Sequence, residues 1–176
     1  MSPAEVKALR QTLAHAGERR LIWLEGDEAD CIARAEALLG GVIYWLGEGP
    51  ACHGPVPAAK ALQRLGQECD TLVFNAFSGF HPDAFGALAG TLRAGGLLLL
   101  LTPPRAQWPE YPDPDRMRLV AQPEEADRAG HGFIARLVHL LAGDPALSLL
   151  PPTSTEPWQP IGEQRRLSHD QAGALP

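Results

Sequence analysis

The chain has 176 residues, of which 45% are hydrophobic and 20% charged, and its formal net charge is −6. This composition is typical of a soluble protein with one globular domain and short tails. The negative charge argues against a strong nucleic-acid binder, because neutralising phosphates needs a basic face. No apolar run approaches the roughly 18 residues that a membrane helix needs, so we expect no membrane association.

The cysteines point to a reducing compartment. Cys31, Cys52 and Cys69 are odd in number and widely spaced, with no Cys-x-x-Cys pair among them. This pattern is typical of reduced thiols rather than of a disulfide framework or a zinc site. The N-terminal residues also lack the apolar stretch of a secretory signal. We therefore expect a cytoplasmic protein.

The first part of the chain predicts alternating helices and strands. Ser2 and Glu5 have the spacing of a capping box, and Gly17 is a typical helix terminator. In chain order we expect a helix from Ser2 to Gly17, a strand over 20–25, a helix over 27–39, a strand over 42–46, a loop over 47–57, a short helix over 58–65 and a strand over 71–74.

The next helix is marked most clearly by its first residues. Phe80 and Phe85 flank a His81 cap at the spacing of a hydrophobic staple, and Pro82 occupies the first helical position, which needs no N–H. Apolar residues continue at helical spacing to Leu92. We expect the helix to run to that point and to end at Gly95-Gly96.

The run from Leu97 to Leu101 contains no polar residue. An unbroken apolar run of this length is typical of a strand covered on both faces, as in parallel sheets. Together with the strand over 71–74 and the helix between them, it predicts a βαβ unit.

The last part of the chain is rich in proline. We expect a surface segment over 102–115, a short fifth strand at Leu119-Val120 and an amphipathic helix over 133–141, followed by a linker over 151–176. The alternation of elements predicts an α/β fold over residues 1–150, a Rossmann-like three-layer sandwich with a mostly parallel sheet.

The residues of the first strand-to-helix loop argue against a nucleotide-binding site. Ligands of such sheets bind outside the carboxyl ends of the strands, and phosphates need glycine-rich loops there. Here Glu25-Gly26-Asp27-Glu28 supplies one glycine, three carboxylates and no lysine, so the fold lacks a phosphate-binding loop. The carboxylates suit either a magnesium ion or a helix cap, and we favour the cap.

Two further patterns resemble catalytic sites only in part. Cys52-His53 combines a thiol with a base, but adjacent residues in a proline-rich loop seldom reach each other productively. Ser78-Gly79 lacks the full Gly-x-Ser-x-Gly pattern of a nucleophile elbow. We therefore predict no catalytic, cofactor-binding or metal-binding residue. A strand-end ligand site built from Asp27, Asn75 and Ser78 is the alternative.

A cluster of basic and aromatic residues follows the fourth strand. Arg105, Trp108, Arg116 and Arg118 combine positive charge with a ring that can stack on bases, so they are candidates for contact with RNA or with another domain. Acidic residues in the same segment weaken this hypothesis and favour a solvated surface loop.

Three segments carry a resemblance to a known family: LIWLEGDEAD, the run from Leu65 to Pro103, and a later Trp-Pro pair. Over residues 5–150 the chain resembles the N-terminal domain of bacterial tRNA(Met) cytidine acetyltransferases. The most specific part is the run from Gly79 to Gly96.

The resemblance implies a role inside a larger enzyme. In that family the domain precedes an ATP-driven helicase-like module and an acetyltransferase domain, and the whole enzyme acetylates the wobble cytidine of elongator methionine tRNA. Acetyl-CoA and ATP or GTP with magnesium are thus implied for the parent, and no cofactor for this chain. The family's phosphate loop and catalytic residues would lie beyond Pro176.

The preferred hypothesis is therefore a non-catalytic scaffold that docks the helicase-like and acetyltransferase domains and helps to place tRNA. A free-standing α/β domain that binds a small molecule or nucleotide is the alternative, and a free-standing RNA binder is a third possibility.

Overall fold

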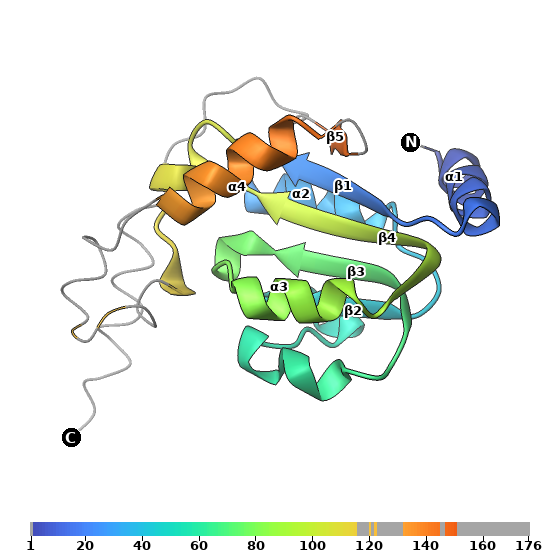
Figure 1. Cartoon of the computed structure of the whole chain (residues 1–176), viewed down its shortest axis with the longest axis horizontal. Helices are drawn as coiled ribbons and strands as arrows, with labels where there is room; N and C mark the ends of the chain where they lie inside the picture. The colour runs from blue at the N-terminus through green and yellow to red at the C-terminus, as the bar shows by residue number, and fades with distance from the viewer. Residues whose placement is uncertain (1, 116–119, 121, 123–131, 145–146, 151–176) are drawn as a thin grey trace.

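The computed structural model describes residues 2–115, 120, 122, 132–144 and 147–150, and it has the expected α/β architecture (Figure 1). Its main elements are α1 (Pro3–Ala16), β1 (Arg20–Glu25), α2 (Glu28–Glu36), β2 (Ile43–Leu46), β3 (Cys69–Asn75), α3 (Pro82–Ala89), β4 (Leu92–Thr102), α4 (Gly132–Ala142) and β5 (Ser148–Leu150). Short 3-10 helices connect them in the described part of the chain, among them η1 (Ala51–His53), η2 (Ala58–Arg64), η3 (Ala76–Ser78) and η4 (Trp108–Glu110).

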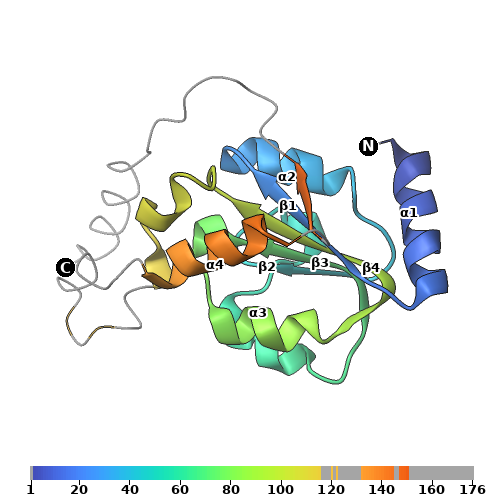
Figure 2. The ribbon, with the colours of Figure 1, turned by 45° about the horizontal axis from the view of Figure 1, so that its top comes forward.

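The strands form one sheet in the order β2-β3-β4-β1-β5, and every neighbouring pair is parallel. Helices cover both faces, which gives three layers (Figure 2). The prediction of a Rossmann-like sandwich is thus confirmed. Among the described residues, no helix is both long and apolar enough to cross a membrane.

Two core clusters lie on opposite faces of the sheet. Because successive side chains of a strand alternate between faces, Leu97, Leu99 and Leu101 pack with α1 and α2, whereas Leu98 and Leu100 pack with η2, α3 and α4. The buried members of the first cluster are Val6, Leu13, Ile22, Leu24, Cys31, Ala35, Leu38, Trp45, Val73, Phe77, Leu97, Leu99 and Leu101. The predicted burial of the fourth strand on both faces is therefore confirmed.

The helix starts follow the sequence signals. Ser2 and Glu5 form the full capping box of α1, and His81 Nδ1 accepts a hydrogen bond from the Ala84 N–H at the start of α3. The rings of Phe80 and Phe85 lie with their centroids 5.3 Å apart across that cap. The hydrophobic staple is thus present.

The predicted end of α3 is wrong. The helix ends at Ala89, and Leu92 already belongs to β4, so Gly95 and Gly96 lie inside a strand. Pairing with β3 explains why: Cys69 is opposite Leu92 and Thr71 is opposite Leu97. Between these pairs β4 has residues 93–96 where β3 has only Asp70, and this irregularity takes up the extra residues.

Other bounds differ by smaller amounts. The helix predicted over 27–39 ends at Glu36, and the one over 58–65 is the 3-10 helix η2. Leu119 lies outside the described residues and Val120 belongs to no strand, whereas β5 pairs with β1. The tail over 151–176 also lies outside the described residues, so its linker character stays a prediction.

Gly95 allows α1 to approach the sheet closely. Its φ is +82°, and a Cβ atom there would lie 2.8 Å from Ala14 Cβ and 2.9 Å from the Arg10 carbonyl oxygen. We expect Gly95→Ala to lower the free energy of unfolding by about 2–4 kcal/mol, through left-handed strain and overpacking against α1.

Gly86 provides the matched control, because it lies within α3 at an ordinary φ with nothing within 4 Å of an added Cβ. Gly86→Ala should raise the free energy of unfolding by about 0.5–1 kcal/mol. Urea denaturation followed by circular dichroism measures both variants. Equal effects of the two substitutions would contradict the close contact.

Candidate functional site

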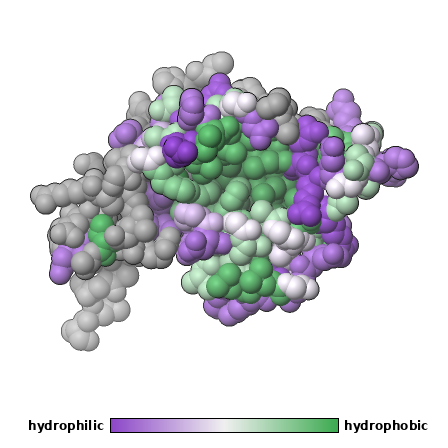
Figure 3. All heavy atoms as spheres, viewed as in Figure 1, coloured by the Kyte–Doolittle hydropathy of each residue, from purple (hydrophilic) through white to green (hydrophobic). Residues whose placement is uncertain are grey.

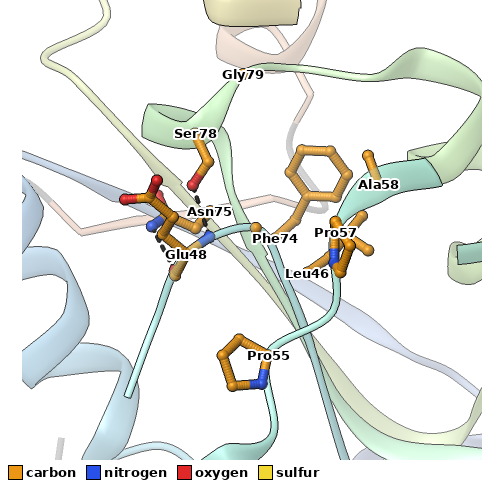
Figure 4. Close-up of a pocket in the computed structure, with 10 residues that line it drawn as sticks. Leu46, Glu48, Pro55, Pro57, Ala58, Phe74, Asn75, Ser78 and Gly79 are labelled. Atoms are coloured by element: carbon orange, nitrogen blue, oxygen red, sulfur yellow. Dashed lines mark hydrogen bonds between the residues drawn. The ribbon is translucent and has the colours of Figure 1, made fainter. Parts of the chain in front are cut away.

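A cavity of about 380 Å³ lies at the carboxyl ends of β2 and β3 (Figure 4). Apolar side chains such as Leu46, Pro57 and Phe74 form part of its wall. Asn75 and Ser78, two of the three residues predicted for a strand-end site, also line it, whereas Asp27 does not. The fold thus brings two of the three together.

The polar groups of this cavity bind one another. Asn75 is 1% exposed; its Nδ2 donates to Glu28 Oε1 over 2.9 Å and to the Glu48 carbonyl over 2.8 Å, while its Oδ1 accepts from Phe77 N–H. Ser78 Oγ accepts from Glu48 N–H over 2.7 Å. Both side chains therefore hold the loop after β2. No residue pattern pointed to Glu48 as their partner, because its backbone rather than its side chain makes these contacts.

A second position for a ligand in such folds is the switch point between adjacent strands whose connections leave toward opposite faces. Here those strands are β1, which leads into α2, and β4, which leads toward α4. The chain closes this position itself. Trp23 Nε1 donates to Thr102 Oγ1 over 2.7 Å, and Gly26 N–H donates to the Thr102 carbonyl over 3.1 Å.

Glu25 completes the closure. Its side chain is 7% exposed, and its carboxylate accepts from Arg105 N–H over 2.9 Å, with Arg105 Nε 4.0 Å away. The segment after β4 is thereby fixed over the end of β1. A phosphate placed here would meet a buried carboxylate, so the geometry agrees with the predicted lack of a phosphate-binding loop.

Asp27 is the N-cap of α2. Its Oδ1 accepts from Asp30 N–H over 2.9 Å, while Arg34 forms an ion pair with Asp30 over 2.7 Å. The capping interpretation is thus confirmed, and the neighbouring Glu28 is bound by Asn75.

Cys31 lies in the same region but is fully buried. Its Sγ donates to the Leu24 carbonyl over 3.3 Å, and burial raises the pKa of the thiol to about 12, although Arg34 nearby acts in the opposite direction. A thiol with such a pKa is almost wholly protonated at neutral pH, so Cys31 is not a nucleophile.

The contact residues predicted after β4 differ in exposure. Trp108 is 2% exposed; its ring lies edge-on to Trp23, with centroids 6.0 Å apart, and to Phe80. A ring held there cannot stack on a base, so this part of the prediction is wrong: the residue belongs to the core. Arg105 is exposed, and Arg116 and Arg118 lie outside the described residues.

Comparison with known proteins shows to which family the domain belongs. The profile of the N-terminal domain of tRNA(Met) cytidine acetyltransferase TmcA matches residues 1–151. The chain belongs to this family. The match covers every described element of the fold.

Full-length relatives of the family extend far beyond the matched region. The TmcA of Nitrosococcus halophilus is 43% identical over 131 residues, which are 72% of this chain and 18% of the relative. The TmcA of Citrobacter koseri is 41% identical over 144 residues, 79% and 21% of the two chains, and that of Salmonella typhimurium is 40% identical over 147 residues, 80% and 21%. The chain spans about a fifth of the length of the curated relatives it matches.

The role of Asp27 can be tested by separating its charge from its capping oxygen. We expect Asp27→Ala to lower the free energy of unfolding by about 1 kcal/mol. Asp27→Asn keeps the acceptor oxygen of the cap and should change the free energy of unfolding by only a few tenths of a kcal/mol. Thermal unfolding with and without magnesium checks this. A magnesium-dependent stabilisation that both substitutions abolish would contradict the cap.

Burial of Cys31 predicts a pH dependence. Its pKa is 9.0 in an ordinary environment and about 12 in the fold, so the unfolded thiol ionises first as pH rises. The contribution of the protonated Cys31 thiol to the free energy of unfolding is therefore complete below pH 9. Above pH 9 this contribution decreases, by at most about 1.4 kcal/mol per pH unit. Urea denaturation from pH ~8 to ~10.5 should therefore show a shallower decline for Cys31→Ala than for the wild type. Parallel declines would contradict the shifted pKa.

Proposed function

We propose that this chain is a non-catalytic N-terminal module of an enzyme that acetylates the wobble cytidine of tRNA(Met), and that it serves as a docking scaffold for the rest of that enzyme. Two findings support this. The domain belongs to the TmcA family but spans about a fifth of its relatives. At the carboxyl edge of the sheet, the side chains of Trp23, Glu25, Asn75 and Ser78 form hydrogen bonds within the chain.

The observation that carries the docking role is an apolar area on the face that bears α3 and α4 (Figure 3). It lies over the sheet between these two helices, and a smaller area covers η2. Surfaces of this kind, surrounded by polar residues, usually contact another protein segment.

Named residues show how the area arises. On the sheet, Leu21 of β1 is paired with Leu98 of β4 and remains only partly buried. On α4, Leu137, Leu140 and Leu141 share one side at helical spacing, and Leu140 is 56% exposed. In η2, Leu62 and Leu65 are 60% and 52% exposed.

The occupant that we propose is the part of the enzyme that follows this domain. The matched domain is the N-terminal one, so the remaining four-fifths of a relative come after it. The last described strand, β5, lies beside β1, which contributes Leu21 to the area. The last described residue, Leu150, is paired with Leu24 at the carboxyl end of β1, the strand that also carries Leu21.

The other expected partners are proposed for the whole enzyme. Acetyl-CoA, and ATP or GTP with magnesium, would bind in the helicase-like and acetyltransferase domains. The net charge of −6 supports contact of tRNA mainly with those later domains, with Arg105 as an exposed basic residue on this one. We place the enzyme in the cytoplasm, where tRNA is modified.

The docking surface can be tested with the separately expressed remainder of the Nitrosococcus halophilus relative. We expect the 176-residue chain to bind it, and Leu140→Glu to weaken binding at least tenfold because the substitution buries a charge in the contact. Ala135→Glu is the matched control, since Ala135 is exposed on another side of α4. Isothermal titration calorimetry measures the affinities. Equal binding by both variants would contradict this surface.

The alternative function, a small-molecule site in the cavity at Asn75 and Ser78, gives a different result in the same preparation. Binding to the native state alone raises the unfolding temperature. The proposed role predicts no shift when ATP with magnesium, GTP with magnesium or acetyl-CoA is added to the isolated chain. A shift that Asn75→Ala abolishes would favour the alternative.

A further inference from the structure

Three residues with metal-binding side chains meet on the other side of the sheet. Glu36 is the last residue of α2, whereas Cys52 and His53 belong to η1, which follows β2. One ligand atom from each lies within 4.8 Å of the other two. Sequence reasoning assigned Cys52-His53 no role, because adjacent residues in a proline-rich loop seldom reach each other productively. The fold places Glu36 beside both.

The histidine ring is already oriented. His53 stacks on the indole of Trp45, with ring centroids 5.5 Å apart and planes 4° from parallel, and its Nε2 lies 3.3 Å from Glu36 Oε1. Trp45 is itself 1% exposed and donates from Nε1 to the Glu48 carbonyl over 2.9 Å. A buried, hydrogen-bonded indole therefore holds the imidazole in place, which reduces the entropy lost when a ligand binds.

The site is open to solvent. Cys52 and Glu36 are exposed, and the His53 side chain is 20% exposed. Cys31 and Cys69 are both buried, so Cys52 is the one cysteine of the chain that a dissolved ion can reach.

We propose that Glu36, Cys52 and His53 bind a divalent ion of the zinc class with three protein ligands and one open position. Thiolate, imidazole and carboxylate together suit Zn²⁺ or Co²⁺, whereas Mg²⁺ and Ca²⁺ prefer oxygen ligands alone. Tetrahedral zinc geometry places ligand atoms roughly 3.3–3.8 Å apart, so closure by about 1 Å converts the present cluster into a coordination shell.

Binding changes the protonation of the site. The Cys52 thiol releases its proton to solvent and binds as a thiolate, and His53 binds through a neutral ring nitrogen. The ion joins the end of α2 to η1, so its binding stabilises the native state. Because binding releases a proton, affinity for the ion increases with pH.

Cobalt titration of the intact chain tests the proposal, because Co²⁺ in a tetrahedral site with a thiolate gives strong visible bands and a sulfur-to-cobalt charge-transfer band. We expect one Co²⁺ per chain, displaced by Zn²⁺ and unaffected by excess Mg²⁺. Cys52→Ser should abolish the charge-transfer band, and Glu36→Gln should weaken binding at least tenfold. His15→Ala, which removes an exposed histidine from α1, is the control and should leave binding unchanged.

Zn²⁺ should also raise the unfolding temperature of the wild type but not of Cys52→Ser, whose exposed side chain can be replaced without loss of packing. Absence of Co²⁺ binding, binding without the charge-transfer band, or equal affinity in wild type and Glu36→Gln would each overturn the three-ligand site.

Discussion

The burial of Leu97–Leu101 on both faces of the sheet is the constraint on which the rest of the fold depends. The strand lies between β3 and β1 and is parallel to both, so its backbone groups are paired on two sides. Its five leucines are at most 6% exposed. Such a strand is stable only if helices cover both faces, and parallel neighbours require the crossover connections that supply those helices.

The position of α1 follows from the same constraint. This helix precedes the first strand and is not needed for any crossover, yet it packs on β4 together with α2. Arg10 secures it, because its guanidinium donates to the carbonyls of Asp70 and Leu38 and to Thr71 Oγ1. Burial lowers the pKa of Arg10. The side chain nevertheless stays charged at neutral pH, because the pKa of an arginine in water lies far above neutrality. The amino ends of the strands are therefore closed by a helix.

At the carboxyl ends, where related folds bind nucleotides, hydrogen bonds hold the loops and leave a cavity of about 380 Å³ beside β2 and β3. Glu25, Thr102 and Trp23 form hydrogen bonds at the switch point, and Asn75 with Ser78 holds the loop after β2. A fold does not determine a function, and in this domain the polar side chains at the switch point form hydrogen bonds within the chain. The two surfaces for which we propose partners lie on opposite faces of the sheet, so docking on the α4 side and ion binding beside α2 can occur independently.

Sequence alone determined the features that depend on neighbouring residues. The caps at Ser2, Asp27 and His81, the parallel character of Leu97–Leu101 and the lack of a phosphate-binding loop all follow from short-range sterics, hydrogen bonding and periodicity. For this reason the α/β class and the order of most elements could be predicted, and the acidic first loop could be assigned to a cap.

Tertiary structure decided whatever depended on residues far apart in the chain. Leu92 continues helical periodicity, yet pairing with Cys69 draws it into a strand. The sequence predicted an exposed ring at Trp108, but Trp23 and Phe80 pack against that ring in the core. Glu36 lies beside Cys52 and His53 only because the fold places the end of α2 next to η1. No local pattern encodes these contacts, because each arises from the packing of elements onto a common sheet.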